Sequence, residues 1–247
     1  MKKANTYFIS DIHLGAKYIS DRFAHERFLV QWLESIEPDC RQLFLVGDVL
    51  DYWFEYKHVI PKGYVRFFGQ LARMSDRGTK ITWLIGNHDI WIYDYLPVEL
   101  GIEVVYNDVA TEIDGKSFFI SHGDGLGNIP IGFKILRKVF RNNTCRKLYS
   151  ALHPRLTIPF ALGWSKSSRQ SERDNSKGAN LNIIEEWAKR FSSENPATDF
   201  IVLGHYHCMV DRKLNNDNTR LIILGDWFET FSYGIFDGKN FMLKKYC

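Results

Sequence analysis

The stretch Gly86-Asn87-His88-Asp89 directly follows the apolar run Ile81-Thr82-Trp83-Leu84-Ile85. A short apolar run of this kind, bounded by glycine, predicts a buried β-strand. The strand ends on glycine and then presents an amide, an imidazole and a carboxylate in three successive positions. Because side chains of these types ligate metal ions, we interpret this strand end as part of a functional site rather than only a turn.

Four other segments repeat this design, each with a β-rich run that leads into potential metal ligands. They are Phe8-Ile9-Ser10-Asp11-Ile12-His13, Leu43-Phe44-Leu45-Val46-Gly47-Asp48, Phe118-Phe119-Ile120-Ser121-His122 and Ile201-Val202-Leu203-Gly204-His205-Tyr206-His207. Five such endings in one chain predict a metal site along the edge of a sheet.

Helical patterns separate the first three of these strands. Apolar residues recur on one side of the segments 28–36 and 63–77, which predicts two amphipathic helices. Strand, helix, strand, helix, strand is the βαβαβ layout, and it implies parallel pairing. Further along we expect three adjacent short strands at 103–106, 110–113 and 117–121, a helix at 183–191, strands at 200–203 and 221–224, and a hairpin of 233–236 with 241–243.

Length and composition favour a single α/β domain. The chain has 247 residues, of which 45% are hydrophobic, and this is enough for one large core. Its four cysteines lie far apart, a pattern that fits neither a disulfide framework nor a zinc ribbon and indicates a reducing compartment. No stretch approaches the roughly 18 apolar residues of a membrane span. We therefore expect a cytoplasmic protein whose contact with a membrane is peripheral.

Residues 125–178 differ in kind from the rest of the chain. They contain eleven Lys or Arg against two acidic residues, a local charge of +9, whereas the remainder carries −6. Apolar residues at helical spacing predict two or three short helices, followed by a mobile polar loop at 165–177. The segment is then a helical insertion in the single domain. A solvated cap without a ligand role is one interpretation, but so many Phe, Ile and Leu residues favour a working lid.

The candidate ligands comprise two carboxylates, one amide and four imidazoles: Asp11, Asp48, Asn87, His13, His122, His205 and His207. This oxygen and nitrogen set without thiolate suits Mn²⁺, Fe or Zn²⁺. Seven ligands exceed the need of one such ion, so we expect two, bridged by one carboxylate, which together can activate a shared water.

His88 remains as a catalytic candidate, able to donate a proton to a leaving oxygen or to hold a phosphate oxygen. One histidine at a strand end is usually a polar cap, but five of the eight histidines follow apolar runs. We place His25, His58 and His153 on helix or loop surfaces without a role. The remaining candidates are groups that orient the ligands, namely Asp51, Asp89 and Asp124, and glycines for close backbone approach, namely Gly47, Gly86 and Gly204.

Five blocks, in this order, resemble the signature of the calcineurin-type metallophosphoesterases: Asp11-x-His13, Gly47-Asp48-x-x-Asp51, Gly86-Asn87-His88-Asp89, His122-Gly123 and Gly204-His205-x-His207. The resemblance implies a four-layer αββα sandwich with a dinuclear metal centre at the strand ends. It implies that Asp11, His13, Asp48 and His207 hold one metal, and that Asp48, Asn87, His122 and His205 hold the other. His88 would be the catalytic histidine, next to Asn87 in the catalytic loop.

Within that family, the chain is similar to the UDP-2,3-diacylglucosamine hydrolase branch in size, in the insertion after His122-Gly123-Asp124, and in Leu224-Gly225-Asp226-Trp227. That branch commonly has Arg where this chain has His88. The resemblance implies cleavage of a pyrophosphate in lipid A biosynthesis with Mn²⁺, at the inner-membrane surface, giving UMP and a lipid monosaccharide phosphate. Candidate contacts to the nucleotide or phosphate are Ser168, Arg169 and Lys177.

Two alternatives stay open. A general phosphodiesterase or nuclease of the same superfamily would use the basic insertion to hold nucleic acid, although the many aliphatic residues there disfavour base stacking. A scaffold that binds partners without turnover would keep the fold, although loss of turnover should erase ligands, and here every one is present.

Overall fold

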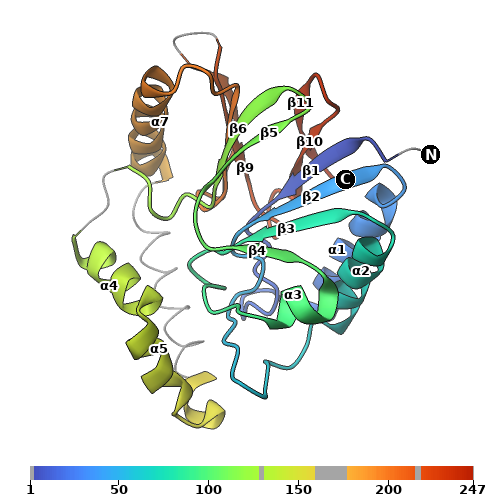
Figure 1. Cartoon of the computed structure of the whole chain (residues 1–247), viewed down its shortest axis with the longest axis vertical. Coiled ribbons are helices and arrows are strands. Elements are labelled where there is room, and N and C mark those ends of the chain that lie inside the picture. Colours follow the sequence, from blue (N-terminus) through green and yellow to red (C-terminus); the bar gives the residue numbers. More distant parts are fainter. Residues whose placement is uncertain (1–2, 128–130, 159–176, 215–217, 247) are drawn as a thin grey trace.

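The computed structural model describes residues 3–127, 131–158, 177–214 and 218–246, except for the side chains of 177–180. Within these residues, two sheets pack together between helices (Figure 1). The first sheet has the order β11-β10-β1-β2-β3-β4 and the second the order β5-β6-β7-β9-β8. The first comprises β1 (Asn5–Ile9), β2 (Cys40–Val46), β3 (Lys80–Leu84), β4 (Glu103–Val105), β10 (Ser232–Phe236) and β11 (Phe241–Lys245), and the second β5 (Val109–Ile113), β6 (Lys116–Ser121), β7 (Phe200–Leu203), β8 (Met209–Lys213) and β9 (Arg220–Leu224).

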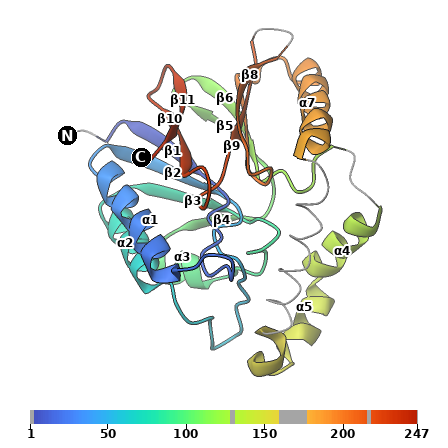
Figure 2. The ribbon, with the colours of Figure 1, turned by 180° about the vertical axis from the view of Figure 1, so that it is seen from behind.

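Helices cover the outer faces of both sheets (Figures 1 and 2). They are α1 (Arg22–Ile36), α2 (Val65–Asp76) and α3 (Tyr95–Leu100) beside the first sheet, α7 (Lys177–Glu194) beside the second, and α4 (Ile131–Arg141) and α5 (Asn143–Ser150) in the insertion. Asp21 begins α1, because its carboxylate accepts the backbone N–H groups of Phe23 and Ala24 at 2.9 Å. The predicted αββα sandwich is confirmed.

Successive side chains along each strand point to opposite faces of its sheet, and this alternation divides the core into three apolar layers. Tyr7 and Ile9 of β1 pack with residues of α1 and α2 on one face. Phe8 points the other way, into the layer between the sheets, where its ring lies 5.1 Å from Phe44 and 5.8 Å from Phe118 between centroids. A third layer joins α7 to the outer face of the second sheet. Strands buried on both faces explain the continuous apolar runs in the sequence.

Parallel pairing brings the ligand-bearing strand ends together. β1, β2 and β3 pair in parallel, and so do β6, β7 and β9. The carboxyl ends of parallel strands lie at the same edge of their sheet, so the five motifs of the sequence meet at the two adjoining edges.

One predicted grouping is wrong. We expected 103–106 to lie beside the two strands that follow it, but β4 pairs in parallel with β3 in the first sheet. β5 and β6 form the hairpin around Asp114-Gly115 in the second sheet. The chain therefore changes sheets between Val105 and Val109, where polar residues 106–108 form the connection. Spacing alone could not show this, since a change of sheet needs no longer a link than a hairpin does.

The insertion is helical where the structure describes it, through α4 and α5. The predicted loop at 165–177 lies outside the described residues, except that Lys177 is the first residue of α7. Across the described ranges, no helix has the length and apolar character needed to cross a bilayer.

Candidate metal centre

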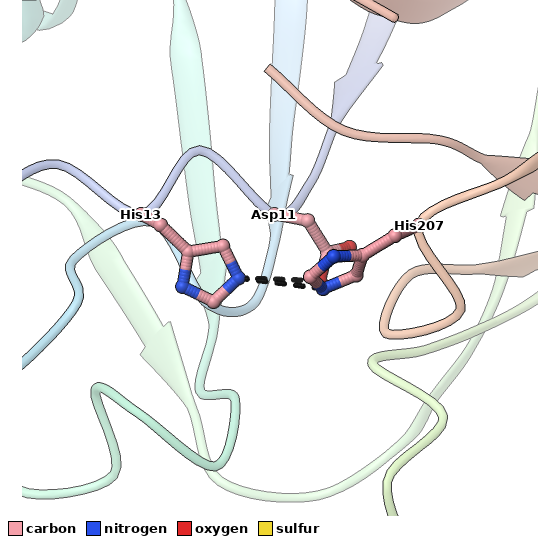
Figure 3. A group of neighbouring side chains, drawn as sticks. All are labelled: Asp11, His13 and His207. Atoms are coloured by element: carbon pink, nitrogen blue, oxygen red, sulfur yellow. Dashed lines mark hydrogen bonds and ion pairs between the residues drawn. The ribbon is translucent and has the colours of Figure 1, made fainter. Parts of the chain in front are cut away.

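Asp11, His13 and His207 form the first cluster of candidate ligands (Figure 3). Asp11 and His13 follow β1, and His207 follows β7 in the other sheet. The Nε2 atoms of the two imidazoles lie 3.4 Å apart, and His207 Nε2 lies 3.1 Å from Asp11 Oδ1. Two nitrogens and one carboxylate oxygen therefore converge on one point from both sheets.

Asp48, His122 and His205 form the second cluster. His122 Nε2 lies 3.3 Å from Asp48 Oδ2 and 3.1 Å from Asn87 Oδ1. Asp48 and Asn87 follow β2 and β3, and the two histidines follow β6 and β7. All seven predicted ligands thus lie at the junction of the two sheet edges.

Asp48 connects the two clusters. Its Oδ1 accepts the backbone N–H of His88 at 2.8 Å, which leaves Oδ2 facing the imidazoles. Oδ2 lies 3.3 Å from His122 Nε2, in the second cluster, and 3.9 Å from His13 Nε2, in the first. A single carboxylate oxygen between two ligand sets is positioned to bridge a pair of ions.

The carboxylate of Asp11 supports a cation at this place. Asp11 Oδ2 accepts hydrogen bonds from Ser10 Oγ at 2.5 Å and from the backbone N–H of His205 at 2.8 Å. The second oxygen, Oδ1, is buried and faces the two imidazoles, 3.1 Å from His207 Nε2 and 3.8 Å from His13 Nε2. A buried carboxylate costs free energy unless a positive charge is near, and a metal ion between this oxygen and the two ring nitrogens would supply that charge. The donor set therefore fits a divalent metal.

Hydrogen bonds also select which ring nitrogen of each imidazole faces the centre. His122 Nδ1 lies 3.0 Å from the carbonyl oxygen of Val46, and because a carbonyl only accepts, Nδ1 carries the proton there. His88 Nδ1 is held in the same way, 3.0 Å from the Asp51 carbonyl. His13 Nδ1 lies 3.5 Å from Asp51 Oδ1. In each ring Nε2 is left for a metal or a substrate.

The three other candidate carboxylates have different surroundings. Asp51 contacts His13 and His88, as described above. Asp89 accepts the backbone N–H of Gly86 at 2.7 Å and that of Val49 at 2.9 Å, so it fastens the ends of β2 and β3 rather than an imidazole. Asp124 pairs with Arg137 of α4 at 3.0 Å, which ties the end of β6 to the insertion.

Backbone conformation is unusual in five of the seven candidate ligands. Asp11, His13, Asp48, His205 and His207 all have φ between 49° and 67°, the left-handed region. Residues other than glycine occupy this region at a cost of roughly 1–2 kcal/mol each, although Asp and His tolerate it better than most. Strain concentrated in this way is typical of functional sites.

Gly86 shows how closely the backbone approaches the centre. A Cβ on Gly86 would lie 2.1 Å from Asp48 Oδ1 and 2.4 Å from the backbone nitrogen of Asp48. The oxygen belongs to a buried side chain that the backbone N–H of His88 holds in place, and the nitrogen is backbone, so the strand ends would have to separate.

We expect Gly86→Ala to lower the free energy of unfolding by about 1–3 kcal/mol, the usual cost of overpacking, and to reduce the bound metal. Thermal unfolding and metal analysis of the purified variant measure both effects. Gly69→Ala is the matched control, because Gly69 is exposed in α2 and a Cβ there meets nothing within 4 Å. The control should be neutral or slightly stabilising. Equal stability of the two variants would contradict the proposed crowding at Gly86.

The buried carboxylates and imidazoles shift one another's pKa. Burial alone would raise the pKa of Asp48, but His122, His88 and His13 outweigh it and hold the pKa well below the usual range. Burial would lower the pKa of His122, yet the negative charge of Asp48 raises it well above normal. The pKa of His207 is raised against burial by Asp11. Burial and the charge of Asp48 raise the pKa of Asp89 to about 6.

These shifts predict a pH dependence of metal binding. Without metal, the raised pKa values favour the protonated forms of His122 and His207, and a metal must displace those protons. We therefore expect Mn²⁺ binding to release protons and to strengthen as pH rises through neutrality. Titration calorimetry in buffers of different ionisation enthalpy counts the released protons. A proton count near zero at pH 7 would contradict the prediction.

Some predicted residues cannot be placed, and others were missed. Ser168 and Arg169 lie outside the described residues, and of Lys177 only the position at the start of α7 is described. Sequence reasoning missed Phe228, whose ring centroid lies 5.2 Å from that of His207 and 5.8 Å from that of His13. Its position two residues after Asp226 in a strand-end motif was the available signal.

His25 was predicted on a helix surface, and this is wrong. It is 8% exposed, and its Nε2 lies 2.6 Å from the carbonyl oxygen of Trp227. The imidazole therefore fastens α1 to the loop after β9. An apolar stripe identifies the buried face of a helix only where that face is apolar, so a buried polar residue near the end of the stripe escapes notice.

A two-sheet αββα scaffold with adjoining clusters of carboxylate and imidazole ligands defines the class of metal-dependent phosphoesterases. The family model "Calcineurin-like phosphoesterase" matches residues 4–209. A UDP-2,3-diacylglucosamine hydrolase of Porphyromonas gingivalis is 38% identical over 98% of this chain and 97% of its own length. A protein of the same name from Aeromonas salmonicida is 28% identical over 91% of this chain and 87% of its own. The chain belongs to the calcineurin-like phosphoesterase family, and it is a hydrolase.

Proposed function

We propose that the protein hydrolyses the pyrophosphate of UDP-2,3-diacylglucosamine to UMP and a lipid monosaccharide phosphate, as a step of lipid A biosynthesis. The observation that carries the proposal is a pair of ligand clusters sharing Asp48, in a chain similar over nearly its whole length to a hydrolase of that name. Asp11, His13, Asp48 and His207 are the proposed ligands of one ion. Asp48, Asn87, His122 and His205 are those of the other, with Mn²⁺ the preferred ion for both.

Two bound divalent ions supply an activated water and offset the negative charge that develops in phosphoryl transfer. The residues of this chain supply the remaining functions. Asp48 holds both ligand sets in register through Oδ2. His88 points Nε2 toward the same oxygen, at 3.9 Å, from a ring held by the Asp51 carbonyl. In this position His88 can protonate the leaving phosphate oxygen or hold a non-bridging one.

The insertion supports a lipid-linked substrate. On α4, Ile131, Ile135 and Val139 recur every fourth residue and are 76%, 58% and 43% exposed. Lys134 and Lys138 lie on the same helix and are also exposed. Apolar side chains of this kind can receive acyl chains, and the basic ones suit an acidic membrane surface. We therefore also propose a peripheral association with the inner membrane.

The insertion is joined to the candidate centre by aromatic contacts. Tyr52 directly follows Asp51, and its hydroxyl lies 3.2 Å from that of Tyr149 in α5. The indole N–H of Trp91, two residues after Asp89, donates to the carbonyl of Phe140 in α4 at 2.9 Å. The same two strand-end loops thus contact both the proposed metal ligands and the insertion, as expected if one substrate spans both.

The test is incubation of the purified protein with UDP-2,3-diacylglucosamine and Mn²⁺, followed by quantitation of UMP. We expect UMP and the lipid monosaccharide phosphate in equal amounts, and no product after removal of metal with a chelator. If no UMP forms while a simple aryl phosphodiester is cleaved, the substrate assignment fails and the reaction class remains. Binding to nucleic acid that weakens steeply with salt would then favour a nuclease.

A further inference from the structure

A hollow of 790 Å³ lies beside the candidate metal centre, within the roughly 300–1,000 Å³ usual for ligand pockets. It is bounded by the loop before α1, the exposed side of α1 and the loop after β9. Among the residues of its walls are the aromatic Tyr18 and Phe228, on the side of the centre, and the polar Asp21, Arg27, Gln31 and Glu229; Phe28 and Phe231 also line it. The mechanism proposed above uses none of these residues.

Phe228 separates the hollow from the proposed ligands. Its ring contacts the imidazoles of His207 and His13, with centroids 5.2 and 5.8 Å away. The ring of Tyr18 meets Phe228 edge to face at 5.2 Å. Since Phe228 belongs to both the hollow and the ligand surroundings, the hollow begins one aromatic ring away from the centre. A group attached to a phosphate at the metals can reach it.

Two regions of the protein lie on opposite sides of the strand ends, and their side chains differ in chemistry. The helix α1, along which the hollow lies, is on one side of the strand ends, and α4 and α5 are on the other (Figures 1 and 2). A diphosphate at the centre carries two substituents that leave in different directions. The acyl-bearing half suits the apolar insertion, so the other half must lie toward α1.

The lining of the hollow suits a pyrimidine nucleoside better than an acyl chain. Aromatic faces stack on bases without regard to sequence. The carboxylates of Asp21 and Glu229 can accept from the ring N–H and the ribose hydroxyls, and Arg27 and Gln31 can donate to the ring carbonyls. An acyl chain in the same place would meet charged groups on several walls.

We propose that this hollow is the nucleoside subsite, in which uracil stacks against Tyr18 and Phe228 while its phosphate lies at the metal centre. This inference rests on the proposed function for the identity of the base. The inference goes beyond the proposed function because it assigns the recognition of the base to residues outside the five family motifs.

The test compares UMP with ribose 5-phosphate, which has the same phosphate and sugar but no base. Both are titrated as inhibitors of the hydrolysis of an aryl phosphodiester with Mn²⁺. We expect UMP to inhibit at about tenfold lower concentration, because one stacked base is worth that much or more. Tyr18→Leu should remove most of this preference and leave the inhibition constant of ribose 5-phosphate unchanged.

Phe23→Leu is the matched control. Phe23 lies in the first turn of α1, close to Tyr18 in the sequence, is 47% exposed and does not line the hollow. It should keep the preference for UMP. Gln31→Ala, also on the exposed side of α1, gives a second variant with the same expected loss if Tyr18→Leu folds poorly. Metal analysis of each variant shows whether the centre is intact.

The outcomes separate this inference from the proposed function. If UMP is released from UDP-2,3-diacylglucosamine but UMP and ribose 5-phosphate inhibit equally, the subsite is wrong and the function stands. If no UMP is released yet the preference exists and depends on Tyr18, the function is wrong and the subsite stands. If Tyr18→Leu instead changes KM according to acyl length with the preference intact, the hollow holds lipid and the subsite is wrong.

Discussion

Replacing Asp48 by alanine is expected to reduce turnover more than about a thousandfold and to remove most of the bound metal. Asp48 Oδ2 lies between His122 Nε2 at 3.3 Å and His13 Nε2 at 3.9 Å, so both proposed ions lose the same oxygen. The loss also removes the negative charge that raises the pKa of His122. Metal analysis and hydrolysis of an aryl phosphodiester measure the two effects.

Asp76→Ala is a matched control for this change, because Asp76 is an exposed aspartate at the end of α2 and belongs to none of the five motifs. It should keep both metal and activity. Asp48→Asn adds a finer comparison, since the amide keeps an oxygen and the size of the side chain but loses the charge. A fully metal-loaded Asp48→Ala protein would contradict the bridging role.

The sequence predicted the ligand-bearing strand ends because parallel strands make such a prediction reliable. Asp11, Asp48 and Asn87 follow β1, β2 and β3, which are neighbours in one sheet. Any residues placed just after such strands meet at one edge, whatever the loops between them do. The convergence of His122 and His205 from the second sheet followed in the same way, once the resemblance implied two facing sheets.

The backbone of the centre could not be predicted. Five candidate ligands adopt positive φ, and no single residue signals this when it is not glycine. The tertiary structure imposes it: Asp11 Oδ2, for example, accepts the backbone N–H of His205 from the other sheet. Gly86 and Gly204 were recognised as places of close approach, but what they approach, the Asp48 and Ser10 side chains, became visible only in three dimensions.

Contacts between remote segments were the other failure of sequence reasoning. Phe228 packs on two histidines of the first cluster, His13 after β1 and His207 after β7, only because the loop after β9 folds back toward both strand ends. The edge strand β8 was also missed, since only Val210 in it is buried and its pattern is mostly polar. Both cases depend on which surface covers a residue, and local periodicity carries no such information.

His88→Ala should separate chemistry from metal binding. The backbone N–H of residue 88, which donates to Asp48 Oδ1 at 2.8 Å, survives the substitution, so both ligand sets keep their geometry. Only the imidazole is lost, and a general acid of this kind contributes about 10²–10⁴-fold. We expect turnover to fall by that factor while metal content stays at the wild-type level. His58→Ala, at an exposed loop histidine, is the control and should change neither.

The size of the loss should also depend on the leaving group, and this distinguishes the two roles proposed for His88. If the imidazole protonates the leaving oxygen, a phenyl phosphodiester should suffer far more from His88→Ala than a p-nitrophenyl one, because p-nitrophenolate leaves readily without a proton. If the imidazole instead holds a non-bridging oxygen, both esters should slow by the same factor. The geometry favours the first result, since Asp51 holds Nδ1 through its carbonyl and leaves Nε2 to exchange a proton. Loss of metal in His88→Ala to the extent seen in Asp48→Ala would overturn the division of roles between the two residues.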